Sequence, residues 1–335
     1  GSFRPIEVVA PEGTIVNVTR PAPAGSHGEI RKRVIATMVG ALSQVAPEKV
    51  AGDLCRSSFH NLLGGFDTRS GREWVHYEWS GGGNGGFAEA DGPSAMAPFD
   101  WGDLVTVQPS EVIESRFPLL VEYSELDTDS GGPGRSRGGL AMRRRIRLTA
   151  PDARYSLLSD GAIVPAFGVL GGQSGKPLSS WVETGDDVIE EFATPGKVGG
   201  HLVEEGERVV LRSAGGGGYG DPLERAPGRV AEDFRLGYIS EAALKNNYGV
   251  VLNDAFGVEL RRLPAGRRAA HRTELEELER ATTDAEAALP VQHAAADRDA
   301  DGRGDDNKHR RENDEARRGR HYVDDPPDPI GQAHD

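Results

Sequence analysis

The sequence is poor in cysteine, in aromatic residues and in long apolar runs. Cys55 is the only cysteine among 335 residues, which excludes an internal disulfide and a cysteine-based zinc site. A lone cysteine is typical of a reducing compartment, so we expect a cytoplasmic protein. No apolar run approaches the roughly 20 residues of a transmembrane helix, and no signal peptide is recognisable, so we expect no membrane partner.

The chain also lacks an excess of positive charge. Its 39 Lys and Arg residues are outnumbered by 53 Asp and Glu residues, which gives a formal net charge of -14. Binding to nucleic acid or to an anionic membrane needs clustered cations, so this balance argues against both kinds of partner.

Glycine and proline, by contrast, are abundant, with 45 and 21 residues. Together with short apolar segments they predict an α+β fold: a β-rich body with glycine-rich turns, one long amphipathic helix near the N-terminus and short C-terminal helices. We expect this body to span residues 1–265. Residues 266–335 begin as a Glu- and Leu-rich helix and continue with few large apolar residues, which predicts a disordered tail.

Several elements can be placed from their patterns. Residues 3–18 predict two short strands around a turn, which we expect to pair with a segment upstream. Apolar residues at three- to four-residue spacing from Glu29 to Ala46 predict a helix with one buried face, capped by Ser26. Further strands are predicted at residues 74–79, 117–123, 142–148 and 209–211, and short helices at 227–236 and 240–248.

The run from Asp129 to Leu140 holds five glycines in twelve residues and lies between two strand-like segments. Glycine permits positive φ angles and a close approach of another backbone or of a ligand. One interpretation is therefore a tight crossing in a β-rich fold. The other is the wall of a polar site, for which the candidate residues are His27, Asn84, Asp129, Arg135 and Arg137. A second glycine run, residues 215–220, is either a structural turn or an anion nest.

Three short motifs in these loops are incomplete. Residues 81–86 have the spacing of a dinucleotide-binding loop, but no helix follows to meet a phosphate. Gly134–Gly138 has the spacing of a nucleophile elbow, but a strand follows Ser136 where a helix is required. Two calcium-loop patterns, beginning at Asp127 and Asp297, carry Gly138 and Lys308 at the twelfth position, where a bidentate carboxylate is needed.

Taken together, ordered motifs along residues 1–252 resemble one known family. They are Phe3-Arg4-Pro5-Ile6-Glu7-Val8, Pro11-Glu12-Gly13-Thr14 with Asn17, Asp129-Ser130-Gly131-Gly132-Pro133-Gly134 followed by Arg137-Gly138-Gly139, Ser159-Asp160-Gly161, and Gly215-Gly216-Gly217-Gly218-Tyr219-Gly220-Asp221-Pro222. The sequence is similar to the hydantoinase B and 5-oxoprolinase family, which includes the large subunits of acetone- and acetophenone-type carboxylases. The resemblance covers only the C-terminal half of a typical member.

The resemblance implies a component of an ATP-dependent cyclic amide hydrolase that acts on a small-molecule substrate. It further implies two partners, a hydantoinase A-type subunit that binds ATP and the N-terminal half of the B-type subunit, without which we expect no activity. Family metal ligands are implied to lie in that upstream half. We therefore expect no metal or cofactor to be bound wholly by this chain, and its histidines at positions 27, 60, 76 and 201 show no metal-ligand spacing.

Two alternatives stay open. The segment Ala95–Asp103 departs from the hydantoinase-type pattern and favours the carboxylase branch, so the chain is alternatively part of an ATP-dependent ketone carboxylase. It is otherwise a non-catalytic assembly scaffold or a truncated remnant.

Overall fold

The computed structural model describes residues 6–97, 107–185, 187–251 and 261–262, with residues 188–191 and 261–262 described only as backbone. The chain divides into two units, Gly1–Glu277 and Leu278–Asp335, and the described residues belong to the first. The tail expected from residue 266 onward lies outside them.

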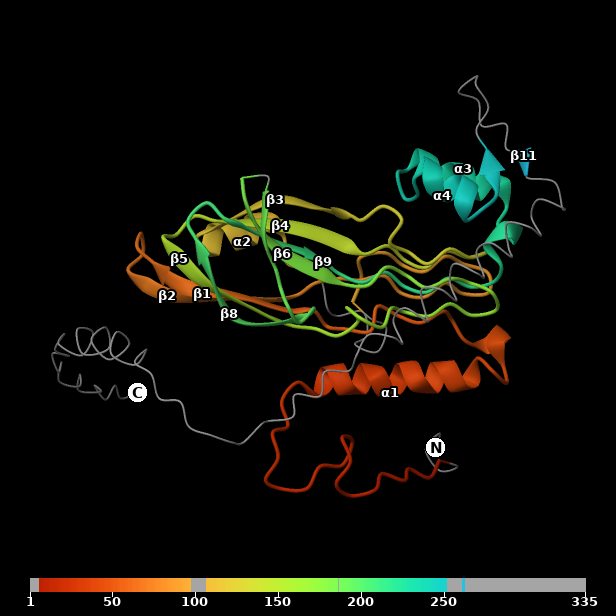
Figure 1. Cartoon of the computed structure of the whole chain (residues 1–335), viewed down its shortest axis with the longest axis horizontal. Coiled ribbons are helices and arrows are strands. Elements are labelled where there is room, and N and C mark those ends of the chain that lie inside the picture. The colour runs from red at the N-terminus through yellow and green to blue at the C-terminus, as the bar shows by residue number, and fades with distance from the viewer. Residues whose placement is uncertain (1–5, 98–106, 186, 252–260, 263–335) are drawn as a thin grey trace, which may run out of the picture. The chain divides into compact units, whose positions relative to one another are not determined.

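Two antiparallel sheets form the body (Figure 1). The first has the order β2-β1-β5-β8, and its strands are β1 (His60–Asp67), β2 (Arg72–Trp79), β5 (Asp152–Leu158) and β8 (Lys197–Glu204). The second has the order β3-β4-β9-β6-β7, and its strands are β3 (Leu119–Leu126), β4 (Met142–Leu148), β6 (Ser179–Thr184), β7 (Asp187–Glu191) and β9 (Arg208–Arg212). The expected β-rich mixture of strands and a few helices is confirmed.

A single apolar cluster lies between these sheets. Leu63 and Tyr155 from the first sheet join Ile146, Val182 and other buried residues of the second. Burial alternates along β4, as expected for a strand with one face against a core. The two sheets therefore pack face to face as a sandwich.

The other described elements flank the sandwich. They are α1 (His27–Leu42), η1 (Pro47–Lys49), α2 (Ser110–Arg116), η3 (Pro222–Glu224), α3 (Pro227–Arg235), α4 (Glu241–Asn246) and the two-residue strands β10 (Val250–Val251) and β11 (Arg261–Arg262). Among the described residues, none of the helices combines the length and apolar character needed to cross a bilayer.

The predicted strands in residues 3–18 are wrong for the described part of that segment. Residues 6–18 contain only an isolated bridge between Thr14 and Asn17, and their apolar side chains are exposed. A strand needs a neighbour that satisfies its backbone groups, and no described strand pairs with this segment.

The orientation predicted for the N-terminal helix is also wrong. Its apolar residues Val34, Met38 and Leu42 are exposed, while Glu29 and Lys32 are buried. Ser26 has a left-handed backbone and makes no capping hydrogen bond from its side chain. Polar anchoring to the body, described below, overrides the apolar periodicity.

Beyond the sheets, four extended glycine segments run side by side toward α3 and α4 (Figure 1). We call residues 81–86, 129–139, 168–175 and 215–220 the glycine core. Backbone hydrogen bonds connect its segments, such as those from Gly86 to Gly217, from Gly132 to Gly216 and from Gly139 to Asn84. The tight crossing predicted for residues 129–140 is therefore present.

The glycine core has no room for side chains. A Cβ added at Gly83 would overlap the carbonyl oxygen of Gly139, and one added at Gly216 would overlap that of Asn84. The backbones have approached to hydrogen-bonding distance across positions where any other residue would hold them apart.

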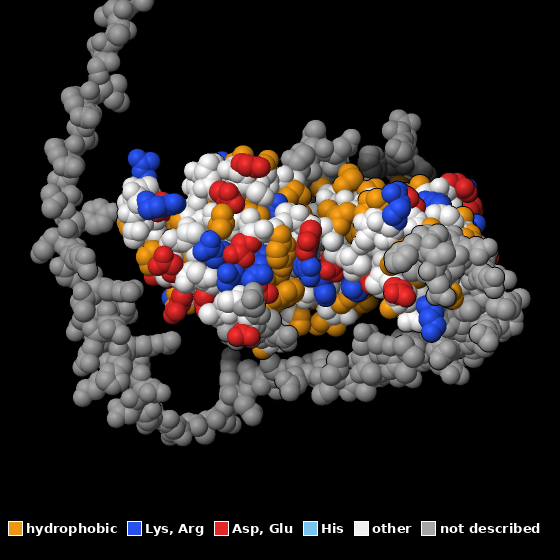
Figure 2. Space-filling view, turned by 90° about the horizontal axis from the view of Figure 1, so that it is seen from above, with side chains coloured by type: hydrophobic (Ala, Val, Ile, Leu, Met, Phe, Trp, Pro, Cys, Tyr) orange, Lys and Arg blue, Asp and Glu red, His pale blue; other side chains and the backbone are white. Residues whose placement is uncertain are grey.

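The outer face of the second sheet is charged. Arg143, Arg145 and Arg147 alternate with the buried residues of β4 and pair with glutamates of β3 and β6, so acidic and basic side chains are mixed on this face (Figure 2). The single carboxylate of Glu122 forms ion pairs with three arginines, Arg145, Arg147 and Arg208. The basic strand is thus largely neutralised by the chain itself.

We predict that Gly83→Ala or Gly216→Ala strongly destabilises the protein. A methyl group must separate two hydrogen-bonded backbones, so we expect a loss of about 3 kcal/mol or more in the free energy of unfolding, with Tm lower by roughly 6–12 °C. Gly228→Ala in α3 is the control, because nothing lies near its Cβ position. Thermal unfolding measures all three, and equal Tm values for wild type and Gly83→Ala would contradict the prediction.

Candidate functional site

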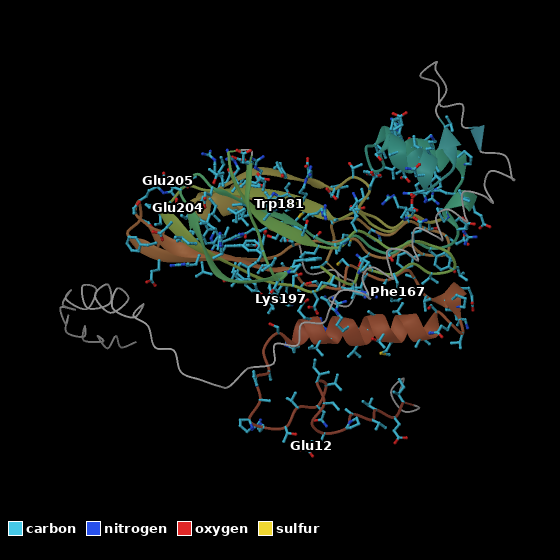
Figure 3. All side chains as sticks on the ribbon, in the orientation of Figure 1. Glu12, Phe167, Trp181, Lys197, Glu204 and Glu205 are labelled. Atoms are coloured by element: carbon cyan, nitrogen blue, oxygen red, sulfur yellow. The ribbon has the colours of Figure 1, made fainter. Side chains whose placement is uncertain are left out.

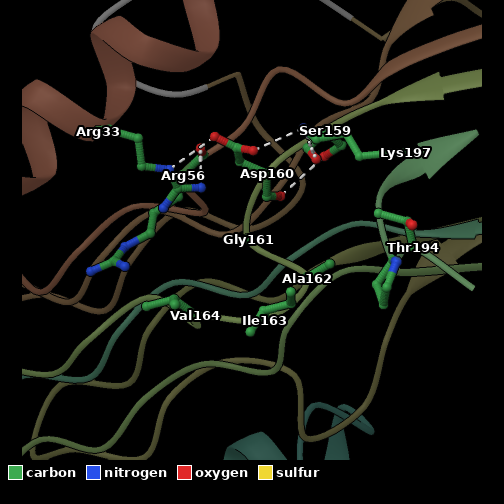
Figure 4. Close-up of a pocket in the computed structure, with 11 residues that line it drawn as sticks. Arg33, Arg56, Ser159, Asp160, Gly161, Ala162, Ile163, Val164, Thr194 and Lys197 are labelled. Atoms are coloured by element: carbon green, nitrogen blue, oxygen red, sulfur yellow. Dashed lines mark hydrogen bonds and ion pairs between the residues drawn. The ribbon is translucent and has the colours of Figure 1, made fainter. Parts of the chain in front are cut away.

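An open cavity of about 360 Å³ lies between α1, the loop after β5 and the start of β8 (Figure 4). One part of its lining is charged, with Arg33, Arg56, Asp160 and Lys197. The other part is apolar and includes Ile163. Its volume is within the range of small-molecule sites.

Asp160 is the centre of the charged part. Its Oδ2 accepts a hydrogen bond of 3.1 Å from Nε of Arg33, and its Oδ1 accepts one of 2.9 Å from Nζ of Lys197. Nζ of Lys197 also donates to the carbonyl oxygen of Ser159 at 2.7 Å. Side chains from α1 and β8 therefore converge on one carboxylate in a loop of the first sheet.

A third cation of the lining, Arg56, forms an ion pair with a buried carboxylate outside the cavity. Its guanidinium pairs with Asp53, which is fully buried, and lies 5.1 Å from the centre of the Phe167 ring. Burial raises the pKa of Asp53, and Arg56 opposes that rise. The lining itself thus holds three cations, Arg33, Arg56 and Lys197, against the single anion Asp160. This excess of positive charge suits an anionic or carbonyl group of a ligand.

Glu29 anchors α1 next to this cavity. Its carboxylate accepts hydrogen bonds from the Ser58 amide at 2.9 Å, from the Ser57 hydroxyl at 2.7 Å and from the Asp160 amide at 3.2 Å. The Ser57 hydroxyl also lies 2.6 Å from that of Ser159, which lines the cavity. A continuous hydrogen-bonded path thus joins the buried carboxylate to the cavity wall.

Burial alone would raise the pKa of Glu29, but the hydrogen bonds and the nearby His60 ring lower it to about 2. Nε2 of His60 lies 3.5 Å from Oε1 of Glu29, and its Nδ1 lies 2.5 Å from the Tyr77 hydroxyl. Glu29 is therefore an ionised acceptor at neutral pH, which fixes the α1 backbone beside the loop at residues 159–161.

Phe167 and Lys197 lie on the side of the body that faces α1 (Figure 3). The Phe167 ring lies 3.3 Å from where a Cβ at Gly40 would sit. Gly40 thus lets the C-terminal half of α1 approach the body, while Glu29 and Arg33 hold its N-terminal half.

Two of the site residues predicted from sequence, Asp129 and Arg137, hold the C-terminal helices in place. Oδ1 of Asp129 accepts a hydrogen bond of 2.8 Å from the Ser240 amide, at the start of α4. Arg137 is buried, and its Nε lies 3.5 Å from Asp233 in α3. Arg225 joins the same ionic cluster through Asp233.

The other three predicted residues are dispersed. Asn84 is buried in the glycine core, and its Nδ2 donates to the Ala97 carbonyl at 3.4 Å. Arg135 donates to the Ala88 carbonyl at 3.1 Å and lies over the Tyr219 ring. His27 is the exposed first residue of α1. None of the five lines the Asp160 cavity.

The anion-nest interpretation of residues 215–220 is wrong. The amides of Gly215, Gly216, Gly217 and Gly218 donate to the carbonyl oxygens of Lys176, Gly139, Asp53 and Gln173. A phosphate would have to displace these bonds, so the amides of residues 215–218 do not form an anion nest.

A metal site does not fit the described residues either. Among them, no three His, Cys, Asp or Glu side chains form a group that could hold a metal ion. Residues 98–106, which carry most of the segment that favours a carboxylase, lie outside the described part.

Sequence reasoning misses the residues that build the cavity. Ser159-Asp160-Gly161 carries the family resemblance but is not predicted as a site, and Glu29, Arg33 and Lys197 are not among the predicted residues. One signal is available: Glu29, Lys32 and Arg33 form a polar face of the helix opposite its apolar residues, and that face is the one that binds the body.

We predict that Glu29→Gln destabilises the protein at neutral pH by an amount on the order of 3 kcal/mol, because an amide replaces an ionised acceptor of three donors. The depressed pKa of Glu29 contributes stability that is full above 4.5, the ordinary value, and is lost as the pH falls toward about 2. The difference between wild type and variant should therefore shrink over that interval.

Urea unfolding at pH 7 and at pH 3 measures this difference. Glu48→Gln, at an exposed position of η1, is the control and should leave stability unchanged at both pH values. A deficit of the Glu29 variant that is equal at both pH values would refute an ionised Glu29.

Comparisons with known proteins agree with the sequence motifs. A family model described as Hydantoinase B/oxoprolinase matches residues 1–222. The B component of a putative D-/L-hydantoinase of a Pseudomonas species is 32% identical over 76% of this chain and 42% of the relative. The beta component of caprolactamase from Pseudomonas jessenii is 29% identical over 76% of this chain and 44% of the relative.

Two solved structures share the fold. The crystal structure of an ATP-dependent caprolactamase from Pseudomonas jessenii matches with a TM-score of 0.62 and 25% identity, over 75% of this chain and 44% of that one. A nucleotide-free acetone carboxylase matches with a TM-score of 0.57 and 23% identity, over 72% of this chain and 35% of that one. The chain thus spans less than half the length of these relatives. On the match over residues 1–222, it belongs to the hydantoinase B/oxoprolinase family.

Proposed function

We propose that this chain is a component of an ATP-dependent enzyme that opens cyclic amides in the cytoplasm. Its proposed partners are a hydantoinase A-type subunit and the N-terminal half of a B-type subunit. The observation that carries the proposal is the family match over residues 1–222, a stretch that includes all residues lining the Asp160 cavity. Relatives named as components of a hydantoinase and of a caprolactamase support this substrate class.

The cavity supplies binding and orientation in this proposal. Arg33 and Lys197 would hold the carbonyl oxygen or a carboxylate of the substrate, and Ile163 would contact its ring. An unstrained amide is a poor electrophile, and the resemblance implies that phosphorylation of its oxygen by ATP makes the carbon attackable by water. We assign the binding of ATP and of the divalent metal to the rest of the complete enzyme. Within this chain, we assign residues 1–265 to the body and residues 266–335 to a charged tail.

A ketone carboxylase is the second candidate, supported by the similarity in fold to acetone carboxylase. The two differ in one reagent, because carboxylation consumes bicarbonate and amide hydrolysis consumes water. Incorporation of ¹⁴C from labelled bicarbonate into a ketone, in the presence of ATP, separates them. An assembly scaffold would bind the partners and give neither product.

We predict ATP-dependent opening of 5-oxoproline, hydantoin or caprolactam when this chain is combined with an A-type subunit and the N-terminal half of a B-type subunit. Lys197→Met should lower kcat/KM for the active substrate by about 10–100-fold, mainly through KM, because one cation of the cavity is lost. Product formation by chromatography, with and without ATP, is the measurement.

The matched control is Lys245→Met, an exposed lysine of α4 that does not line the Asp160 cavity and should leave kcat/KM unchanged. Turnover by this chain alone would contradict its role as a component. Equal kcat/KM for wild type and Lys197→Met would remove the cavity from the proposal.

A further inference from the structure

From Val34 onward, the outer face of α1 is a continuous apolar surface. We define it as Val34, Met38, Ala41, Leu42 and Val45, all of which are exposed. Val34, Met38 and Leu42 follow each other at intervals of four residues and therefore form one ridge along the helix. Met38 is 58% and Val45 is 79% exposed.

No charged residue interrupts this surface. The chain carries none between Val34 and Pro47, although charged residues make up 27% of the sequence. A helix that remained in water would present its polar face outward. Of the four charged residues of α1, however, Glu29, Lys32 and Arg33 are turned to the body and only Arg31 is exposed. The exposed apolar ridge is therefore what an interface requires.

A second exposed apolar stretch precedes the helix. In residues 6–18 the side chains of Ile6, Val8, Val9, Ile15 and Val16 are all at least half exposed. These residues are all β-branched and favour strands. No described strand pairs with them, so their backbone groups are available to a strand of a partner.

We propose that the outer face of α1 and residues 6–18 form one docking surface for the remaining part of a hydantoinase B-type subunit. This inference rests on the proposed function, because it takes its partner from that subunit type. The occupant follows from the lengths: the match covers 76% of this chain but only 42% and 44% of two relatives of that type. More than half of such a subunit therefore lies outside the matched stretch.

The position of this surface gives the docking a consequence for the cavity. Arg33 of α1 lines the cavity and holds Asp160, while Val34, the next residue, belongs to the outer face. A helix with its side chains is only about 10 Å across. A partner on the outer face would thus lie one helix diameter from the charged part of the cavity.

The test uses the full 335-residue chain. The probe is the portion of the Pseudomonas jessenii caprolactamase beta component that this chain does not match. The two are first coexpressed to detect a complex, and the Kd is then measured by calorimetric titration of one purified protein with the other. The variant is Met38→Lys/Leu42→Lys. Lysine near the C-terminus of α1 does not weaken the helix, so a loss of binding can be attributed to the changed outer face of α1. The control is Leu236→Lys. Leu236 at the end of α3 is 48% exposed and Leu42 at the end of α1 is 49% exposed, so the two leucines match in exposure and in their position at a helix end.

We expect a 1:1 complex for wild type and for Leu236→Lys, and a Kd at least tenfold higher for the double variant. Hydrogen exchange should show the amides of residues 6–18 protected on binding. Equal Kd values for all three proteins, or no complex with wild type, would overturn the proposal. A wild-type homodimer that the double variant abolishes would also overturn it, because the occupant would then be a second copy. Binding of the probe without turnover in the complete mixture would contradict the proposed function but would still support the docking surface.

Discussion

Backbone-to-backbone contact in the glycine core is the constraint on which the rest of the structure depends. The sheets end where its segments begin, and hydrogen bonds between main-chain atoms hold these segments to one another. Such packing stabilises this part of the fold without apolar side chains, because it satisfies polar groups that would otherwise be buried unpaired. It also explains the glycine content, since many positions in these segments have backbone where a Cβ would be.

The same constraint decides what the conspicuous loops can do. Amides that already donate to carbonyl oxygens cannot also bind a phosphate, so a loop that resembles an anion site becomes structural. Asp129 and Arg137 follow the same logic, because their side chains join the glycine core to α3 and α4. Chemistry is left to a place where side chains converge, and the loop at residues 159–161 is such a place.

The sequence predicts the local elements better than their surroundings. Alternation along residues 142–148 matches β4, and the periodicity after Glu29 matches α1. What fails is the direction in which α1 faces, because periodicity finds two faces of a helix but does not tell which one meets the body. Ser57, Ser58 and Asp160, far from Glu29 in sequence, decide that question through hydrogen bonds. The cavity depends on the same long-range contacts, so only its Ser-Asp-Gly motif is recognisable in the sequence.

Anchoring by Glu29 and exposure of the outer face are two sides of one arrangement. An ionised carboxylate that accepts three hydrogen bonds fixes the rotation of the helix about its axis, and the apolar residues then face away from the body. If the apolar face met the body, Glu29 and Arg33 would be in water, and neither the Ser57–Ser159 path nor the Arg33 contact with Asp160 would form. The polar anchor therefore builds the charged part of the cavity and presents the apolar ridge in a single step, which couples the site to the surface that we propose as an interface.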